Sequence, residues 1–366
     1  MKPMKNLIKE YSAELGIDCV GFTDVRPFIR DQNIIEKRYR EGKLVLVNKE
    51  LAKGCSPKEL LSGARSIISL AISYPFSNKK ISKEGPVGRV SAYSLVSDYH
   101  KILNTKILKL IEFIKKETPV KYLASVDSGL LIDKASAYRA GVGWYGKNTL
   151  IYCNGFGSRV FLGEILCDLE LEPDEPQNNR CGECTLCLDA CPTGALKEPF
   201  NIDPLKCISY LTQMKGFMPH DKRELIGNWI YGCDICQEVC PHNIKRIEKD
   251  KNEFKLFIDG YVELEKIVNM NNKRFQEYFG NTALYWRGKN TIQRNAVIVL
   301  GNLACEDSAQ LLIPLLESPS PIVRGSVPWA LDKIGIKSAN RLLSKALERE
   351  KDERVIAEIK RVLDNS

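Results

Sequence analysis

Apolar residues recur at two different spacings along the first half of the chain, and these spacings predict its helices and strands. In residues 7–16 and 98–117 the apolar positions lie three and four residues apart, which indicates amphipathic helices. The apolar run SIISLAISY at 66–74 predicts a buried strand, and KYLASVD at 121–127 predicts another. Residues 151–171 indicate two further strands around a turn. This mixture predicts an α/β arrangement for the N-terminal part.

The C-terminal part of the chain is repetitive. Arg294, Arg324 and Arg354 are spaced by 30 residues, and each lies near the start of a helix-like segment. Further helical segments lie between them. A helical pair that recurs about every 30 residues is typical of an α-solenoid of the HEAT type. The alternative is a set of ordinary helices whose arginines coincide by chance.

A polar stretch with two prolines, EPDEPQNNR at 172–180, separates the N-terminal part from a cysteine-rich segment. We therefore predict an α+β protein with four consecutive segments. They are an N-terminal α/β domain at 1–172, a cysteine-rich domain at 173–250, a helical connector at 251–281 and the HEAT-like domain at 282–366.

Composition narrows the class of protein. The chain has 366 residues, of which 44% are hydrophobic, and this is enough for several packed domains. No run of about 18 apolar residues predicts a membrane span, and the N-terminus lacks the apolar core of a signal peptide. We expect a cytoplasmic protein, in which 13 cysteines indicate metal or redox chemistry rather than disulfides. The net charge of +8 permits a polyanionic partner without requiring one.

Eight of the cysteines fall into a pattern that predicts iron–sulfur clusters. The first run is Cys181-x2-Cys184-x2-Cys187-x3-Cys191, followed by Pro192. This is the bacterial ferredoxin spacing, in which the fourth cysteine binds the other of two clusters. Short gaps allow one loop to wrap three corners of an iron–sulfur cube, and the longer gap carries the fourth thiolate away from it.

The second run is Cys233-x2-Cys236-x3-Cys240, and it lacks a first cysteine because Ile230 occupies that position. Cys207 can supply the missing thiolate. The predicted ligand sets are Cys181, Cys184, Cys187 and Cys240 for one [4Fe–4S] cluster, and Cys191, Cys207, Cys233 and Cys236 for the other. Two zinc sites are the alternative, and a disulfide framework is a weaker one. The other five cysteines are expected to be small buried hydrophobes.

Further polar residues are candidates for a site. Asp127 ends a predicted strand before a glycine turn, where a carboxylate is either a helix N-cap or a catalytic acid, and spacing alone favours the cap. Arg287, Lys289 and Arg294 form a basic cluster beside a tryptophan. Such clusters bind phosphate backbones, although a solvated face is the more usual explanation. Lys215 lies between cluster cysteines and could approach a substrate.

The order of these motifs resembles that of the epoxyqueuosine reductases, over nearly the whole chain. The resemblance rests on VDSGLLIDKASAYRAGVGWYGKNTL, CGECTLCLDACPTGAL, CISYLTQMKGFMP, YGCDICQEVCPHN and WRGKNTIQRNAV, in this order. It implies an oxidoreductase that removes the epoxide oxygen of epoxyqueuosine, at the wobble position of a tRNA anticodon, to give queuosine. The N-terminal domain would then bind cobalamin and resemble reductive dehalogenases and nitroreductases. The cysteine-rich segment would be a ferredoxin-like domain with two [4Fe–4S] clusters.

The resemblance also implies roles for individual residues. Asp127 matches the proton donor of the family, which reverses the preference for a cap, and burial against the corrin is expected to raise its pKa. The implied cobalamin contacts are Ser91, Tyr93, Asp127, Ile151, Leu162, Ser209 and Gln213. The residues implied to face tRNA are Lys215, Arg287, Lys289 and Arg294.

Some positions depart from known cobalamin patterns. The family usually carries an arginine where this chain has Gly54, and the stretch 92–96 lacks a usual arginine and tryptophan. His100 is not expected to ligate cobalt, because Leu103 replaces the glycine of the D-x-H-x-x-G motif.

We expect a monomer without a membrane segment. The resemblance implies an external low-potential electron donor and a tRNA with a queuosine-type anticodon as partners. Three alternatives remain at this point, of which a HEAT-type interaction scaffold with purely structural clusters is the weakest, and the other two are redox proteins. One is a cobalamin-dependent reductase of a small molecule, similar to reductive dehalogenases. The other is a ferredoxin-like electron carrier without chemistry of its own.

Overall fold

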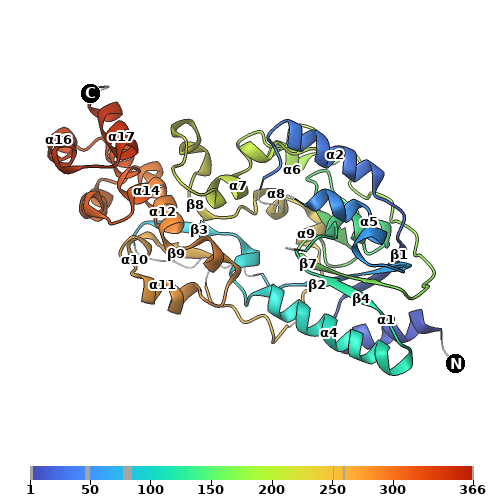
Figure 1. Ribbon diagram of the computed structural model, residues 1–366. Helices are drawn as coiled ribbons and strands as arrows, with labels where there is room; N and C mark the ends of the chain where they lie inside the picture. Colours follow the sequence, from blue (N-terminus) through green and yellow to red (C-terminus); the bar gives the residue numbers. More distant parts are fainter. Residues whose placement is uncertain are drawn as a thin grey trace. The chain divides into compact units, whose positions relative to one another are not determined.

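The computed structural model describes residues 3–45, 50–76, 85–127, 129–249, 251–258 and 260–364 (Figure 1). Contacts group the chain into two compact units. Unit 1 comprises Met1–Pro75, Asp98–Leu205 and Ile235–Phe254, and unit 2 comprises Phe76–Ser97, Lys206–Asp234 and Lys255–Ser366. This grouping differs from the four consecutive segments expected from the sequence, because the cysteine-rich segment contributes to both units.

Unit 1 is built on a four-stranded antiparallel sheet with the strand order β1-β2-β7-β4. The strands are β1 (Cys19–Asp24), β2 (Ser66–Ser73), β4 (Tyr122–Ser125) and β7 (Val160–Cys167). The predicted strands at 66–74, 121–127 and 151–171 are thus confirmed. Every residue of β2 is buried, which agrees with its unbroken apolar run.

Helices cover both faces of this sheet, and alternation along β7 shows which residues face which side (Figure 1). A Cβ atom at Gly163 would meet Leu103 and Ile107 of α4 (Tyr99–Glu117), which lies on one face. The preceding Leu162 packs on the opposite face against an apolar cluster that includes α5 (Asp133–Arg139). Both neighbours of Gly163 therefore face α5.

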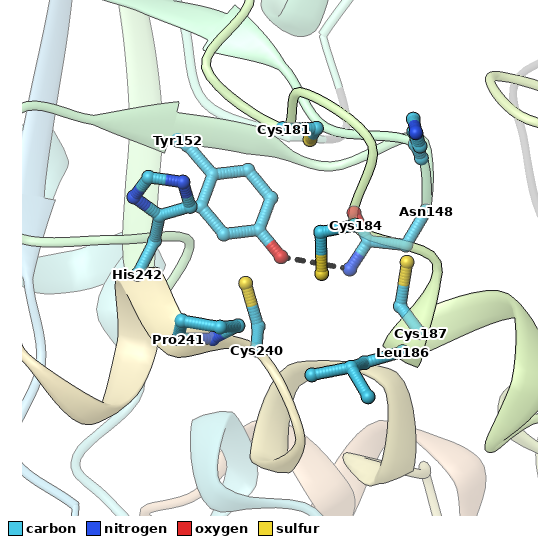
Figure 2. Close-up of a pocket in the computed structure, with 10 residues that line it drawn as sticks. Asn148, Tyr152, Cys181, Cys184, Leu186, Cys187, Cys240, Pro241 and His242 are labelled. Carbon is cyan, nitrogen blue, oxygen red and sulfur yellow. Dashed lines mark hydrogen bonds between the residues drawn. The ribbon is translucent and has the colours of Figure 1, made fainter.

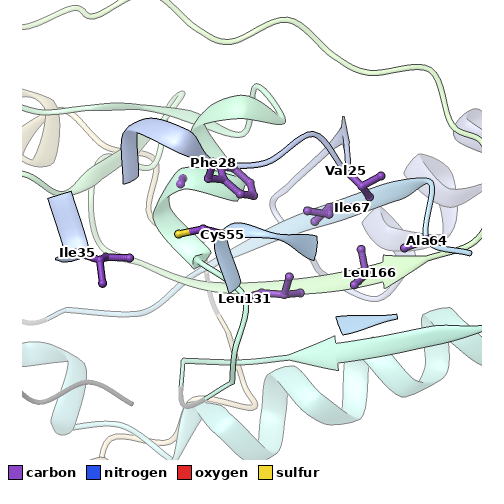
Figure 3. Close-up of a cluster of buried hydrophobic side chains, with 9 residues drawn as sticks. Val25, Phe28, Ile35, Cys55, Ala64, Ile67, Leu131 and Leu166 are labelled. Atoms are coloured by element: carbon purple, nitrogen blue, oxygen red, sulfur yellow. The ribbon is translucent and has the colours of Figure 1, made fainter. Parts of the chain in front are cut away.

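A second apolar cluster joins the sheet to the N-terminal helices (Figure 3). Its members are Val25, Phe28, Ile35, Cys55, Ala64, Ile67, Leu131, Ala135 and Leu166. The cluster brings together segments more than 100 residues apart, and burial of its apolar side chains fixes the loop after β4 against the sheet. Cys55 is fully buried in it, as expected for a cysteine outside the two runs.

The other elements of unit 1 are short, apart from two helices of 11 and 12 residues. They are α1 (Met4–Glu14), α2 (Ile29–Arg40), α3 (Pro57–Leu60), the hairpin β5 (Gly143–Tyr145) and β6 (Ile151–Cys153), α6 (Leu186–Asp189), α8 (Ile235–Glu238) and α9 (Pro241–Ile244). The predicted helices at 7–16 and 98–117 correspond to α1 and α4. No helix in the part of the chain that the structure describes combines the length and apolar character needed to cross a membrane.

Unit 2 contains a three-stranded sheet, with β3 parallel to β8 and antiparallel to β9, and a series of helices. Its elements are β3 (Val87–Val90), β8 (Trp229–Tyr231), β9 (Tyr261–Glu263), α7 (Ile208–Gln213), α10 (Leu264–Val268), α11 (Asn272–Phe279), α12 (Lys289–Leu303), α13 (Ala309–Leu312), α14 (Pro321–Arg324), α15 (Val327–Ile334), α16 (Ala339–Arg349) and α17 (Glu353–Leu363). Helices dominate the chain from 264 onward, which confirms the predicted solenoid.

The three arginines of the repeat have different surroundings in the structure. Arg324 forms a bidentate pair with Glu350, with distances of 2.7 and 2.8 Å, whereas Arg354 pairs with Asp352 on the surface. Arg294 is completely buried. Equivalent positions in a helical repeat therefore serve different contacts, because each helix packs on a different neighbour.

Candidate functional site

Four cysteines of unit 1 converge on one pocket (Figure 2). Cys181 and Cys184 come from the loop that leads into α6, Cys187 lies within α6, and Cys240 is the residue before α9. Figure 2 shows their sulfur atoms directed into the same space. The thiols also interact electrostatically, since the pKa of Cys187 is raised first by burial and then by Cys240. This is the first predicted ligand set, assembled from two distant parts of the chain.

Local backbone geometry places these sulfurs. The Cys184 N–H donates to the carbonyl of Cys181 at 3.1 Å, and Gly182 between them adopts a φ of +51°, which favours glycine. Asn179 accepts a hydrogen bond from the Cys181 N–H at 2.9 Å. On the second loop, Pro241 takes the first helical position of α9, where its missing N–H costs nothing. Proline thus begins a helix directly after the cysteine.

Tyr152 lines the same pocket as Cys240. The Asn148 amide donates to the Tyr152 hydroxyl at 2.9 Å, which orients it (Figure 2). Burial, and then Cys240, raise the pKa of Tyr152 far above its usual value, so the hydroxyl remains protonated. Its hydroxyl is a polar neighbour of the four cysteines in this pocket, and polar neighbours of a cluster tune its reduction potential.

A single zinc ion fits these cysteines less well. Zinc needs thiolates about 2.3 Å from one ion. No three His, Cys, Asp or Glu side chains in the described ranges converge tightly enough to hold one metal ion. The four sulfurs instead surround a shared space, which suits the corners of a cube.

The other four cluster cysteines are divided between the units. Cys191 and Cys236 belong to unit 1, and Cys207 and Cys233 belong to unit 2. Cys207 is the residue before α7, and Cys233 follows β8 by two residues. Their ligation of a second cluster therefore remains a prediction from the spacing.

Asp127 stands on a strained turn after β4. Its φ of +52° lies in the left-handed region that few residues other than glycine adopt. Its side chain is 61% exposed and accepts a hydrogen bond from the Tyr99 hydroxyl at 2.8 Å. The helix α5 begins later, and its N-cap is Ile132. Asp127 is therefore not a helix N-cap, and the interpretation from spacing alone is wrong.

His100 completes a polar group around this carboxylate. Its Nε2 lies 3.4 Å from Asp127, and its Nδ1 lies 2.7 Å from Asp98, which also caps α4. Hydrogen bonds to Asp127 and then to Asp98 raise the pKa of His100 to about 9. His100 in turn lowers the pKa of Asp127, with Tyr99 adding to the effect. In this structure a cation and a hydroxyl stabilise the charge of Asp127. The rise in its pKa that is expected from burial against the corrin remains a prediction.

Two further carboxyl groups lie beside this turn, one buried and one partly buried, and neither was predicted from the sequence as a site residue. Glu164 of β7 is fully buried and faces Asp133 at the start of α5. Burial, and then Asp133, raise the pKa of Glu164 well above its usual value. Burial raises the pKa of Asp133 to about 7, and Asp133 also lies against the Asp127 backbone. The one feature of the sequence that could have identified Glu164 is a glutamate inside an otherwise apolar strand.

The face of the sheet around Glu164 offers polar groups to a ligand. Ser69 and Ser125 are its strand partners on either side, and their hydroxyls have no hydrogen-bond partner within the described residues. Cobalamin carries many amide side chains, so unpartnered hydroxyls near the exposed Asp127 fit such a group. Ile151 and Leu162, two predicted contacts, lie in the apolar cluster on this same face.

The other predicted cobalamin contacts belong to unit 2. The Ser91 hydroxyl donates to Asp234 at 2.5 Å, and Tyr93 packs on Tyr231 with ring centroids 6.0 Å apart. Ser209 accepts hydrogen bonds from the Gln213 amide, through its carbonyl at 3.0 Å and its hydroxyl at 3.2 Å. The structure thus gives these side chains roles within unit 2, and contact with cobalamin remains a prediction.

The departure at Gly54 has a structural reason. A Cβ atom there would lie 1.7 Å from the Leu130 carbonyl oxygen, so this backbone accommodates no side chain. Because Leu130 belongs to the loop after Asp127, the close approach at Gly54 supports that loop.

The predicted tRNA-facing residues differ in exposure. Lys215 is exposed and Lys289 is partly exposed, so both can reach a phosphate. Arg287 is 8% exposed and stacks on Trp286, with 3.4 Å between its guanidinium carbon and the ring centroid. Arg294 is fully buried and bonds to backbone carbonyls. The expectation that Arg294 faces tRNA is therefore wrong for this structure, because the fold encloses its guanidinium.

Comparison with known proteins supports both the clusters and the solenoid. The family described as 4Fe-4S double cluster binding domain matches residues 180–243, and the HEAT repeat family matches 288–364. The family described as epoxyqueuosine reductase QueG, DUF1730, matches residues 55–128. An epoxyqueuosine reductase of Bacillus anthracis is 38% identical over 99% of this chain and 97% of its own length. One of Bacillus subtilis is 37% identical over 99% and 95%.

Solved structures agree with these matches. A crystal structure of an epoxyqueuosine reductase with an epoxyqueuosine-modified tRNA-Tyr stem loop has a TM-score of 0.93 and 37% identity, over 99% of this chain and 98% of that one. A Bacillus subtilis structure, described as having its catalytic aspartate loop swung out of the active site, has a TM-score of 0.93 and 36% identity.

The two-part cysteine array, the α+β unit and the HEAT helices define an iron–sulfur oxidoreductase with a double [4Fe–4S] cluster domain. The sequence identity to the epoxyqueuosine reductases is above 30% along nearly the full length of this chain, which identifies its family. The chain belongs to the epoxyqueuosine reductase family.

Proposed function

We propose that this chain reduces epoxyqueuosine in tRNA to queuosine, with Asp127 at the centre of proton delivery. The reaction needs two electrons and two protons, and the epoxide oxygen leaves as water. The observation that carries the proposal is the exposed Asp127 carboxylate, backed by Tyr99 and by a histidine that holds its proton up to a pH of about 9. A general acid of this kind must be protonated when the oxygen departs.

The chain's own residues divide the proton work. At neutral pH the raised pKa of His100 and the lowered pKa of Asp127 mean that the pair holds one proton, located on His100. Transfer along the 3.4 Å contact makes Asp127 the group that presents the proton. Asp98 on the other ring nitrogen keeps the imidazole oriented. The proton donor is thus the Asp127 carboxyl group, which receives its proton from His100.

Two kinds of cofactor would supply the electrons. The eight cysteines would hold two [4Fe–4S] clusters, with Cys181, Cys184, Cys187 and Cys240 on one and Cys191, Cys207, Cys233 and Cys236 on the other. Cobalamin would supply low-potential two-electron chemistry. Its proposed contacts are Asp127, Ile151, Leu162, Ser91, Tyr93, Ser209 and Gln213.

A tRNA would meet the basic residues of unit 2. Lys215, Lys289 and the partly covered Arg287 offer positive charge to phosphates, in agreement with the stem–loop complex of a relative. A monomer is proposed, with an external low-potential electron donor.

The function is tested by anaerobic incubation of the cluster-loaded protein with epoxyqueuosine-containing tRNA, cobalamin and a strong reductant. We expect mass analysis of the nucleosides to show loss of epoxyqueuosine and appearance of queuosine. The same incubation without cobalamin is the control and should leave the epoxide intact. Unchanged epoxyqueuosine with a fully loaded protein would refute the proposal.

Replacing His100 by glutamine should change how the rate depends on pH. Glutamine can still donate a hydrogen bond to Asp127, but it carries no exchangeable proton of the right pKa. In the wild type the rate should fall only as pH rises through about 9, where His100 loses its proton. In His100→Gln the rate should already fall with pH between about 6 and 8 and be at least about tenfold lower at neutral pH, because Asp127 alone must be protonated.

The measurement is single-turnover epoxide reduction across this pH range, with iron content and cobalamin binding checked at each pH. His220→Gln, at the edge of Trp329 in unit 2, is the control and should keep the wild-type profile. Identical profiles for wild type and His100→Gln would remove His100 from the proton path.

A further inference from the structure

Three consecutive polar residues in α12 are buried, and each bonds to a different part of unit 2. Gln293 is 6% exposed, and Arg294 and Asn295 are completely buried. Polar side chains at this depth destabilise a fold unless every group is bonded. The Gln293 amide donates to carbonyls at the end of α10 and just after it, among them that of Val268 at 2.9 Å. The other two residues bond in the opposite direction, toward the cysteine-bearing segments.

Asn295 connects α7 to β8. Its amide donates to the carbonyl of Thr212 at 2.7 Å and to that of Ile230 at 2.8 Å. Its own oxygen accepts two hydrogen bonds from Arg294, at 3.1 and 2.7 Å. The side-chain amide is therefore saturated, and its position is set by four hydrogen bonds at once.

Arg294 holds the turn that carries Lys215. Its remaining guanidinium nitrogen donates to the carbonyl of Met214 at 2.9 Å and to that of Gly216 at 2.6 Å. These two carbonyls flank Lys215, whose side chain is exposed. Within the described residues the Arg294 charge is bonded to amide and carbonyl oxygens, with no carboxylate in salt-bridge distance. The position of the turn and that of Asn295 are thus tied through one side chain.

The segments that Asn295 joins are those that carry the two cluster cysteines of unit 2. Cys207 is the residue before α7, and Cys233 follows β8. The Gly232 N–H donates to the Thr212 hydroxyl at 2.9 Å, so the end of α7 is bonded directly to the residue before Cys233. A Cβ atom at Gly232 would lie 2.4 Å from that of Ser91, so the loop is also packed tightly from the other side.

We propose that Arg294 and Asn295 couple the Lys215 turn to Cys207 and Cys233, so that RNA bound at the turn alters the second iron–sulfur cluster. The two residues are positioning residues, since neither touches substrate or cluster. The inference deepens the proposed function by giving the tRNA an influence on electron delivery. Partners that orient metal ligands influence cofactor affinity and potential. A shift of the turn moves Arg294, and with it the amide that holds both ligand-bearing segments.

The test uses the anaerobic, cluster-loaded full chain and an unmodified tRNA-Tyr anticodon stem loop. Electron paramagnetic resonance of the reduced protein is recorded with and without saturating RNA, and binding is followed separately by anisotropy of a labelled stem loop. Because no epoxide is present, the outcome does not depend on turnover. We expect RNA to change the signal of one of the two clusters in the wild type.

Asn295→Leu is the variant that removes the link, and Asn302→Leu is its matched control. Asn302 lies on the same helix and donates in the same way to the carbonyls of Arg223 at 3.0 Å and Gly227 at 2.8 Å, away from both cysteines. Asn295→Leu should lose iron from about eight toward about four per chain, or keep both clusters and lose the RNA response. Asn302→Leu should keep the iron content and the response.

Lys215→Ala is the second variant, on the exposed side of the turn, where substitution leaves the buried bonds in place. It should keep both clusters and their spectrum and lose the response to RNA. This variant therefore tests the inference even if Asn295→Leu fails to fold. The inference is overturned if saturating RNA leaves the wild-type spectrum unchanged. It is equally overturned if Asn295→Leu or Lys215→Ala responds to bound RNA as the wild type does.

Discussion

Replacing Asp127 by asparagine should abolish epoxide reduction while both clusters and cobalamin stay bound. Asparagine has the same size and can accept the Tyr99 hydrogen bond, but it cannot deliver a proton. The loss should be about 10²- to 10⁴-fold in the single-turnover rate, the usual contribution of a general acid. Removal of the carboxylate should also let the pKa of His100 fall from about 9 toward its ordinary value, because Asp127 is the largest cause of the rise.

Single-turnover reduction, followed by nucleoside mass analysis, gives the rate. Nuclear magnetic resonance titration of the His100 ring in the same variant gives its pKa. Asp307→Asn, an exposed carboxylate in the solenoid, is the control and should leave both unchanged. A variant at Asp127 that turns over at the wild-type rate would show that the proton comes from elsewhere.

Replacing Cys240 by alanine should remove one of the two clusters, and that cluster should be the one held by the first cysteine run. The reason is the convergence of Cys240 with Cys181, Cys184 and Cys187 on one pocket, although Cys240 belongs to the second run in sequence. Iron should fall from about eight to about four per chain. Electron transfer from an external donor should fail, and epoxide reduction with it.

Double variants identify which cysteines share a cluster. Cys187→Ala combined with Cys240→Ala should lose no more iron than either change alone, since both belong to one cube. Cys191→Ala combined with Cys240→Ala should lose both clusters, and Cys305→Ala, exposed and outside both runs, should lose none. If Cys191 and Cys240 instead proved to share a cluster, the crossed ligation would be wrong.

Contacts between residues far apart along the chain could not be predicted from the sequence, or were predicted wrongly. Asp127 was identified, but its partners Tyr99 and His100 lie on α4, and no local pattern pairs that helix with the turn after β4. The buried Glu164 was missed because an apolar strand with one charge predicts only a strand. Its pairing with Asp133 depends on which face of β7 meets α5.

Arg294 shows the same limit from the other direction. The sequence places it in a basic cluster at the start of a repeat, as it does Arg324 and Arg354, and exposure is the usual state of such residues. In the structure Arg294 is completely buried, and its bonds are to the backbone of the Lys215 turn or to Asn295. The burial of a helical residue depends on which segments pack over the helix, and a repeat pattern in the sequence does not predict those segments.

The amino-acid sequence alone determined the eight cluster cysteines, the strand and helix pattern of the N-terminal part and the helical repeat at the C-terminus. These are local properties: a cluster loop needs thiolates at fixed short gaps, and helices and strands need apolar residues at fixed periods. Tertiary structure alone decided that His100 and Tyr99 contact Asp127, that Glu164 faces Asp133, and that Arg294 and Asn295 bind backbone rather than solvent. Those outcomes depend on which distant segments pack together, because burial and neighbouring charge set both pKa values and hydrogen-bond partners.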